Sequence, residues 1–214
     1  MKKKDSKIYY EKRAQLTLIY NFSSSIYSTE IKLQDRPDLY DSINNVGIEV
    51  TRSFYDNDAE ISSLGTKCTN KHIAQVDENR MKYIKSLEGE LFEIDQYIYG
   101  CCFPAHWVTS TVIKNSYIKK IKKLNQGHYR SCTHYDLYIY SPGFDEFEEN
   151  HINNFMSEIL KIQKNYNKRF RNVYIDDETV IYICNCYNNT INKHFVDKGK
   201  LHNICVESKN YVNM

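Results

Sequence analysis

The sequence lacks the motifs by which many active sites are recognised. It contains no glycine-rich phosphate loop, no Gly-x-Ser-x-Gly elbow and no paired-histidine helix motif. Only 7 Gly and 3 Pro are present, which argues against long flexible linkers. No apolar run approaches the ~20 residues of a membrane helix. These absences argue against a P-loop protein, an α/β-hydrolase and a helical membrane protein.

Length and composition favour one globular domain. The chain has 214 residues, 41% of them hydrophobic, which is enough for one substantial core. The hydrophobic pattern is irregular at about residues 55–108, and we interpret this stretch as an insertion in a single domain, 1–214. The basic start, Met1 to Lys4, is followed by polar residues, unlike a signal peptide, so we expect a cytoplasmic protein without a membrane partner.

The seven cysteines lack the regular spacing of a disulfide framework. Reduced and mostly buried thiols are therefore expected. Cys184 and Cys186 lie in a strand-like apolar run, where alternation places both on one face, as is typical of core residues. The alternative is a structural zinc site, although its ligand spacing would be unusual. It could draw on Cys184, Cys186, His194, His202 and Cys205, or on Cys132 with His134.

The most informative segment is a predicted hairpin with one acidic residue on each arm. The first arm, residues 35–40, contains Pro37, which suits the start of an edge strand. The second arm covers residues 47–51, and the Asn- and Gly-containing stretch between the arms is typical of a turn. Such a turn brings Asp38 and Glu49 close together.

Two acids on one polar face form a candidate metal site. Side chains alternate along the second arm, so Glu49 and Thr51 share a face. Hard cations such as magnesium or manganese take oxygen ligands, which Asp38 and Glu49 would supply. The alternative is a hairpin with a solvated polar face, in which both acids are ordinary surface residues. Glu11, on a helix predicted over residues 8–23, could lend a further acid, although an exposed helix charge is the commoner role.

Pro37-Asp38 followed by Glu49-x-Thr51 resembles the motif of the PD-(D/E)XK nuclease superfamily. In that superfamily Pro-Asp opens one strand and acid-x-Lys closes the next. The resemblance implies an α/β fold, or α+β, with a small mixed sheet flanked by helices in a restriction endonuclease-like core. It also implies that Asp38 and Glu49 hold a magnesium (or manganese) ion against the scissile phosphate. Thr51 stands where the superfamily has lysine.

The predicted order of elements agrees with this resemblance. A helix over residues 8–23 precedes the hairpin, and a second helix from about 109 to 124 is followed by a strand at 135–140. A long helix, and strands at 172–175 and 179–184 joined by an acidic turn, complete the pattern. The acids of that turn, Asp176, Asp177 and Glu178, are a minor alternative metal site.

A basic block occupies the second predicted helix and the residues after it. Between Val112 and Arg130 there are six basic residues and no acidic one. Apolar residues at helical spacing would face the core and leave the cations outward, where a phosphate backbone is a natural partner. Solubility is the ordinary alternative for a charged helix surface. The candidate nucleic-acid contacts are Lys114, Lys119, Lys120, Lys122, Lys123 and Arg130.

The sequence therefore predicts a nuclease that hydrolyses phosphodiester bonds, with DNA favoured over RNA. Asp38 and Glu49 would be the metal ligands, and Thr51 would hold a water or a ligand. An ammonium from the basic helix, Lys114 or Lys120, could take the part of the missing lysine. The alternative function is a catalytically inactive nuclease-like module that binds nucleic acid or protein. The aromatic stretch 100–107 could add a base-stacking surface, or could simply pack against the core.

Overall fold

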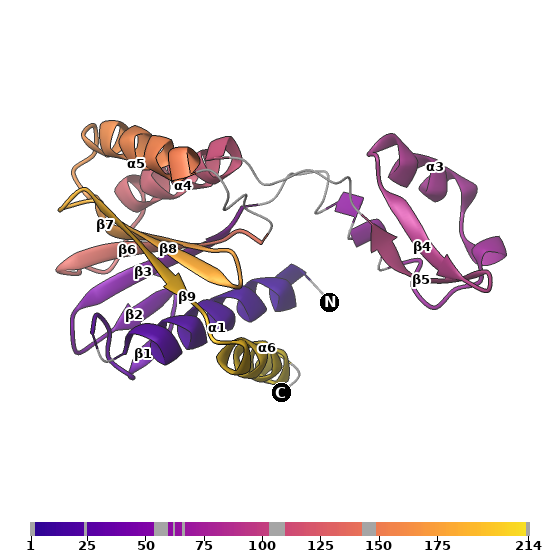
Figure 1. The fold of residues 1–214 in the computed structure, drawn as a ribbon, viewed down its shortest axis with the longest axis horizontal. Helices are drawn as coiled ribbons and strands as arrows, with labels where there is room; N and C mark the ends of the chain where they lie inside the picture. The colour runs from indigo at the N-terminus through magenta and orange to yellow at the C-terminus, as the bar shows by residue number, and fades with distance from the viewer. Residues whose placement is uncertain are drawn as a thin grey trace. The chain divides into compact units, whose positions relative to one another are not determined.

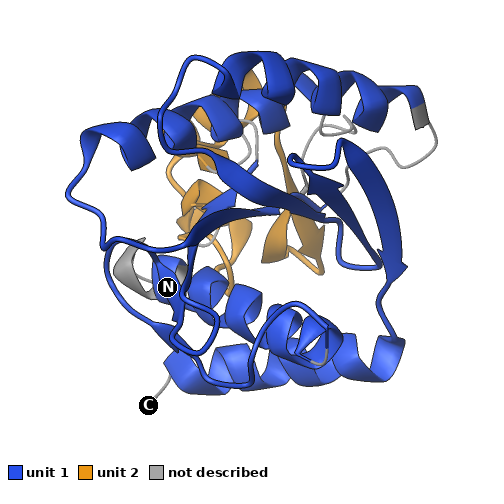
Figure 2. Ribbon diagram, turned by 90° about the vertical axis from the view of Figure 1, so that its left-hand side faces the viewer, with its two compact units in different colours: residues 1–53, 108–214 blue, residues 54–107 orange. Residues whose placement is uncertain are grey.

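The computed structural model of the chain describes residues 3–23, 25–53, 60–61, 63–65, 67–102, 110–142 and 149–212. The chain divides into two compact units, coloured separately in Figure 2. The first unit comprises residues 1–53 and 108–214, and the second comprises residues 54–107. The stretch interpreted as an insertion coincides with the second unit. All the candidate site residues belong to the first.

A mixed seven-stranded sheet forms the centre of the first unit (Figure 1). Its strands are β1 Ile31–Leu33, β2 Leu39–Asp41, β3 Val46–Arg52, β6 His134–Tyr140, β7 Phe170–Asp176, β8 Val180–Asn185 and β9 Thr190–Phe195. They lie side by side in the order β1-β2-β3-β6-β7-β8-β9. Strands β3, β6 and β7 run parallel to one another, whereas the other neighbouring pairs are antiparallel. The expected α/β class, a mixed sheet flanked by helices, is therefore confirmed.

Helices cover both faces of this sheet (Figure 1). They are α1 Lys3–Phe22, α4 Ser110–Gln126, α5 Glu149–Gln163 and α6 Lys198–Val212. Helices α4 and α5 pack on one face, where Leu137 and Ile139 of β6 meet Ile121 and Phe155 in the main apolar core. Helices α1 and α6 pack together on the other face. Because side chains alternate along β6, Tyr138 points toward α1.

A buried ion pair joins α1 to the end of β7. Arg13 is only 1% exposed, and its guanidinium lies 3.6 Å from a carboxylate oxygen of Asp176. The Tyr138 hydroxyl donates a hydrogen bond to the same carboxylate. Asp176 therefore ends β7 inside the protein, and the prediction that it belongs to the turn between the two strands is wrong. Since a lone buried charge is costly, Arg13 and Asp176 depend on each other.

Most predicted elements are present. The helices expected at 8–23 and 109–124 correspond to α1 and α4, and the strand expected at 135–140 is β6. The predicted hairpin near residue 177 is formed by β7 and β8. Strands β1 and β9 and helix α6 were not predicted.

Gly47 allows the β2–β3 hairpin to pack closely against the chain before β6. A Cβ atom added at Gly47 would lie 2.8 Å from Cγ of Pro37 and 3.0 Å from Sγ of Cys132. We expect Gly47→Ala to lower the free energy of unfolding by about 1–3 kcal/mol, because an overpacked strand must shift. Urea unfolding measures this loss. Gly100→Ala is the control, because its added Cβ has no neighbour within 4 Å; equal losses would contradict the packing argument.

The second unit has a small core of its own. It contains the 3-10 helix η1 Ile73–Gln75, helix α3 Glu78–Ser86 and the antiparallel strands β4 Glu90–Ile94 and β5 Tyr97–Cys102. Strands β4 and β5 form a hairpin within the stretch that was interpreted as an insertion. Most of the aromatic stretch at 100–107, from Phe103 onward, lies outside the described residues. None of the helices in the described part of the chain combines the length and apolarity needed to cross a bilayer.

Candidate active site

The pairing of β2 with β3 places the two candidate acids opposite each other. Leu39 pairs with Ile48, so Asp38, the residue just before β2, lies across from Glu49. The two side chains are almost fully buried, with Asp38 2% and Glu49 1% exposed. The alternative of a solvated polar face is therefore wrong, because neither carboxylate has the hydration of a surface acid.

Lys120 joins the two carboxylates. Its Nζ atom lies 3.0 Å from Oδ2 of Asp38 and 2.7 Å from Oε2 of Glu49. Lys120 comes one residue before Ile121, a buried residue of the apolar stripe by which α4 packs on the sheet. Like charges opposite each other on neighbouring strands repel, so the ammonium is needed to stabilise this pair. Of the two lysines left open by the sequence, Lys120 reaches the acids, whereas Nζ of Lys114 lies 3.0 Å from Oε1 of Glu158.

The N-terminal part of α1 supplies two further charged groups. Nζ of Lys7 lies 3.6 Å from Oδ1 of Asp38 and 3.0 Å from Oε1 of Glu11. Glu11 is 8% exposed, so the expectation of an exposed helix charge is wrong. The second oxygen of Asp38, Oδ2, also accepts a hydrogen bond from the Val50 amide at 2.9 Å. Each oxygen of Asp38 therefore faces a cation.

The pKa values follow from burial opposed by these charges. Burial acts to raise the pKa of Asp38, but the Lys120 ammonium, the Val50 amide and Lys7 outweigh it, and the pKa is lowered. Burial acts to lower the pKa of Lys120, but the charges of Asp38 and Glu49 raise it above its ordinary value. Burial raises the pKa of Glu11, and the Asp38 carboxylate adds to the rise while Lys7 opposes it. Lys120 is therefore a fixed cation at neutral pH.

The other predicted catalytic residue, Thr51, follows Glu49 on the same face of β3. Its hydroxyl lies 3.5 Å from the carbonyl oxygen of Arg52, and no hydrogen bond joins it to Asp38, Glu49 or Lys120. Its role in holding a water or a ligand stays a prediction. Nζ of Lys123 lies 3.8 Å from Oε2 of Glu49, so a second cation of α4 borders the acids.

The donor set of Asp38 and Glu49 fits a hard divalent cation. Both carboxylates converge on one positive charge, and Oε1 of Glu49 is buried with no hydrogen-bond partner among the described residues. Within the described part of the chain, no three His, Cys, Asp or Glu side chains are grouped to hold a metal ion. Magnesium does not need such a group, because it often takes only one or two carboxylates together with phosphate oxygens and waters.

The cysteines are placed as core residues. Cys184 and Cys186 are buried free thiols in the main apolar core. Burial raises the pKa of the Cys186 thiol to about 12, so it stays protonated and is a poor zinc ligand. The expectation of reduced, buried thiols is therefore confirmed for this pair, and the described residues offer no group for the zinc alternative.

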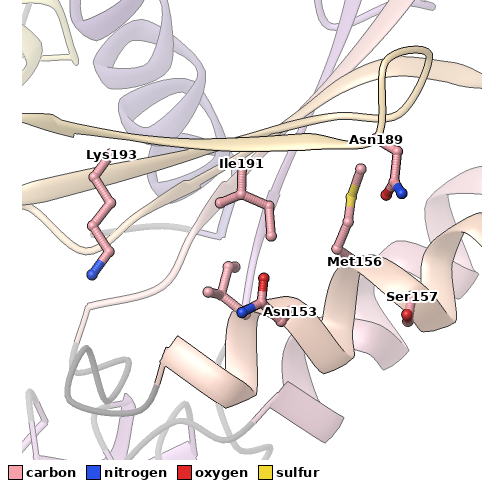
Figure 3. A pocket seen from close by; sticks show the side chains of 7 residues that line it. Asn153, Met156, Ser157, Asn189, Ile191 and Lys193 are labelled. Atoms are coloured by element: carbon pink, nitrogen blue, oxygen red, sulfur yellow. The ribbon is translucent and has the colours of Figure 1, made fainter.

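Two hollows lined by described residues of the first unit bear on the site. The first, which we call the basic groove, borders the acids and is lined by Arg36, Lys119, Lys122, Lys123, Gln126, Gly127, His128 and Tyr129. The second lies between α5 and β9, and neither Asp38 nor Glu49 is among its described lining residues (Figure 3). Among the described residues that line this second hollow, Lys193 alone is charged. The predicted contact Arg130 lies outside the groove lining, with its guanidinium 4.1 Å from the Tyr40 ring centre.

In comparisons with protein-family models, curated proteins and solved structures, no match to this chain was found. The function of the chain is therefore inferred from the geometry of the site and from the resemblance of its motif.

The lowered pKa of Asp38 predicts how stability changes with pH. A carboxyl whose folded-state pKa is depressed contributes stability above its unfolded pKa of ~3.9, and loses it as the pH falls through the folded value. We therefore expect the wild type to be more stable than Asp38→Asn at pH 7, with the difference narrowing below about pH 4. Urea unfolding at several pH values measures this difference. A constant difference would contradict the ionised, cation-paired state of Asp38.

Proposed function

We propose that the chain is a metal-dependent nuclease of the PD-(D/E)XK kind, which hydrolyses phosphodiester bonds in DNA, with RNA as the alternative substrate. One observation carries the proposal: Asp38 and Glu49 lie opposite each other, with Nζ of Lys120 3.0 Å and 2.7 Å from their oxygens. Two acids and a lysine are the side chains that the motif requires. Here the lysine comes from α4 and not from the position that Thr51 occupies.

The arrangement of the elements also supports a restriction endonuclease-like core. Helix α1 precedes strands β1, β2 and β3, and α4 then leads to β6. Strand β6 lies parallel to β3, directly beside the strand that carries Glu49. This is the order of helix, strands, helix and strand that the resemblance implies, on a sheet with helices on both faces.

The acids would hold a magnesium or manganese ion through their carboxylate oxygens. When bound there, the ion would neutralise charge on the phosphate and lower the pKa of a coordinated water, which is the proposed nucleophile. Asp38 is suited to this role because its pKa is lowered and it stays ionised at neutral pH.

Lys120 would supply a fixed positive charge next to the reacting phosphate. Its raised pKa means that it does not take a proton from water at neutral pH, so it is a poor general base. A buried, preorganised ammonium instead stabilises negative charge that develops as the phosphodiester is attacked. Thr51 carries no charge and is unable to stabilise the phosphate in this way.

The alternative is a catalytically inactive module that keeps a basic surface and binds nucleic acid or protein. Thr51 in place of the motif lysine favours this alternative. Lys120 weighs against it, because the ammonium is present at the acids although it comes from another element. The two functions differ in their need for metal, since an inactive module would bind in a salt-sensitive way without it.

A plasmid assay tests the proposal. Purified protein with magnesium or manganese is expected to convert supercoiled DNA to nicked and linear forms, and EDTA is expected to stop the reaction. Salt-sensitive DNA binding without cleavage in either metal would favour the inactive module instead.

A further inference from the structure

The basic groove is a second binding feature of the first unit, beside the buried acids. We propose that it binds the backbone phosphates next to the one that is cut, so that the substrate is a nucleic-acid polymer and not a single nucleotide. This inference rests on the proposed nuclease function, because that function places the phosphate that is cut at Asp38 and Glu49. The groove itself is defined by its own residues.

The charge of the groove is available for a ligand. Lys119 and Lys122 are exposed and form no ion pair with any residue that the structure describes. Lys114, on the same helix, is instead neutralised by Glu158. None of the described residues that line the groove is acidic. The other two cations of the lining have acidic partners: Arg36 lies 3.9 Å from Asp35, and Lys123 lies 3.8 Å from Glu49. Lys119 and Lys122 lack such a partner, so an anionic ligand would stabilise them.

The groove and the acids are joined by two residues. Lys123 lines the groove, and its Nζ lies 3.8 Å from Oε2 of Glu49. Tyr129 also lines the groove and is 9% exposed. Burial raises the pKa of this phenol, and the charge of nearby Glu49 adds to the rise. A ligand in the groove would therefore contact residues that themselves border the acids. The phosphate next to the one that is cut would occupy such a position.

Arg36 reaches the groove from a different part of the chain. It lies in the segment before β2, and its backbone has φ 55°, in the left-handed region that non-glycine residues seldom adopt. Its carbonyl oxygen accepts a hydrogen bond of 3.2 Å from the Arg130 amide. The segment carrying Asp38 is thus tied to the segment after α4, so the groove and the acids are held by the same two segments.

A polynucleotide suits this hollow better than a small anion does. Its phosphates repeat along the strand, so one molecule meets Arg36, Lys119 and Lys122 in succession while another phosphate lies at the acids. Such contacts act on the backbone and carry no base preference. Binding should therefore be strong, salt-dependent and largely independent of sequence.

A binding experiment tests the groove without cleavage. The full chain carrying Glu49→Gln is titrated with a labelled DNA duplex in EDTA, at several salt concentrations. Adding Lys119→Gln and Lys122→Gln is expected to weaken binding about tenfold and to reduce the slope of log K against log salt by about 2, near 0.9 for each lost phosphate contact. The matched control adds Lys161→Gln in the last turn of α5 and Lys164→Gln just after that helix. Both are exposed lysines outside the groove, and their removal should leave the slope unchanged.

A kinetic experiment tests the link to the acids. With Glu49 intact, the Lys119→Gln, Lys122→Gln double variant should raise KM for plasmid DNA about tenfold. Hydrolysis of bis(p-nitrophenyl) phosphate, which has one phosphate and cannot extend into the groove, should change by less than about twofold. Equal losses on both substrates would overturn the inference, as would an unchanged salt slope.

The outcomes separate the groove from the proposed function. If the wild type cuts DNA and the groove variant binds DNA as tightly as the wild type, the proposed role of the groove is refuted and the nuclease function is supported. If the wild type does not cut DNA, and the slope of log K against log salt falls in the groove variant but not in the control, the nuclease function is refuted. The groove is then supported as a nucleic-acid binding site. If the Lys161→Gln, Lys164→Gln control lowers the slope as much as the groove variant does, the binding is due to general surface charge and the inference is overturned.

Discussion

Lys120→Met is expected to reduce DNA cleavage by at least about 100-fold, the usual loss when one preorganised donor is removed from a reacting centre. The reason is that Lys120 is the cation in contact with both Asp38 and Glu49, and Thr51 offers no replacement. Single-turnover cleavage of a labelled duplex measures the loss. Lys120→Arg, which retains the charge in a larger group, should keep more activity than Lys120→Met.

The same substitution should also weaken the fold, and this effect has a separate test. Without the ammonium, two buried carboxylates face each other, and breaking such a buried pair typically costs about 3–5 kcal/mol. The cost should fall as the pH is lowered, because protonated carboxyls no longer repel. Circular dichroism at the assay temperature identifies the folded fraction to which the rate is normalised. Cleavage by folded Lys120→Met at the wild-type rate would refute the assigned role.

Glu49→Gln and Asp38→Asn should each stop cleavage while the chain stays folded. Losing one carboxylate would remove part of the charge that holds the proposed divalent ion, and such an ion would supply several kcal/mol of transition-state stabilisation. We expect at least about a 100-fold fall in rate for each variant. An amide is close to a carboxylate in shape and still accepts a hydrogen bond from Lys120, so the packing around it is retained.

Glu158→Gln is the matched control for these variants. Glu158 also forms an ion pair with a lysine of α4, but with Lys114, on a different part of the helix surface. Its removal changes the net charge by the same amount and should leave cleavage unchanged. If Glu49→Gln, Asp38→Asn and Glu158→Gln all cut DNA like the wild type, the assigned site is excluded.

The sequence predicted the elements whose signals are local. The apolar stripe of α4 and the largely apolar runs of β6 and β8 are visible in single stretches of sequence, and so is the turn that pairs Asp38 with Glu49. The two acids are close in the chain, and a hairpin brings such residues together whatever the rest of the fold does. Their proximity could therefore be predicted.

The sequence offered Lys114 or Lys120 as the cation of the site but could not choose between them, because their positions depend on how the helix docks. Lys120 and Asp38 are 82 positions apart, and the rotation of α4 on the sheet decides which of its lysines reaches the acids. Arg36 joins the groove from outside the basic block for the same reason. Glu11 was expected at the surface because charged residues usually lie there, and only the packing of α1 buries it.

A crystal of the full chain, soaked with manganese and measured at the metal's absorption edge, would show whether Asp38 and Glu49 bind one ion. We expect an anomalous peak within about 2.5 Å of a carboxylate oxygen of both Asp38 and Glu49, with the Lys120 ammonium beside it. That peak should vanish in Glu49→Gln. A fully occupied manganese ion elsewhere, with none between these two acids, would contradict the claim that they form a metal-dependent active site.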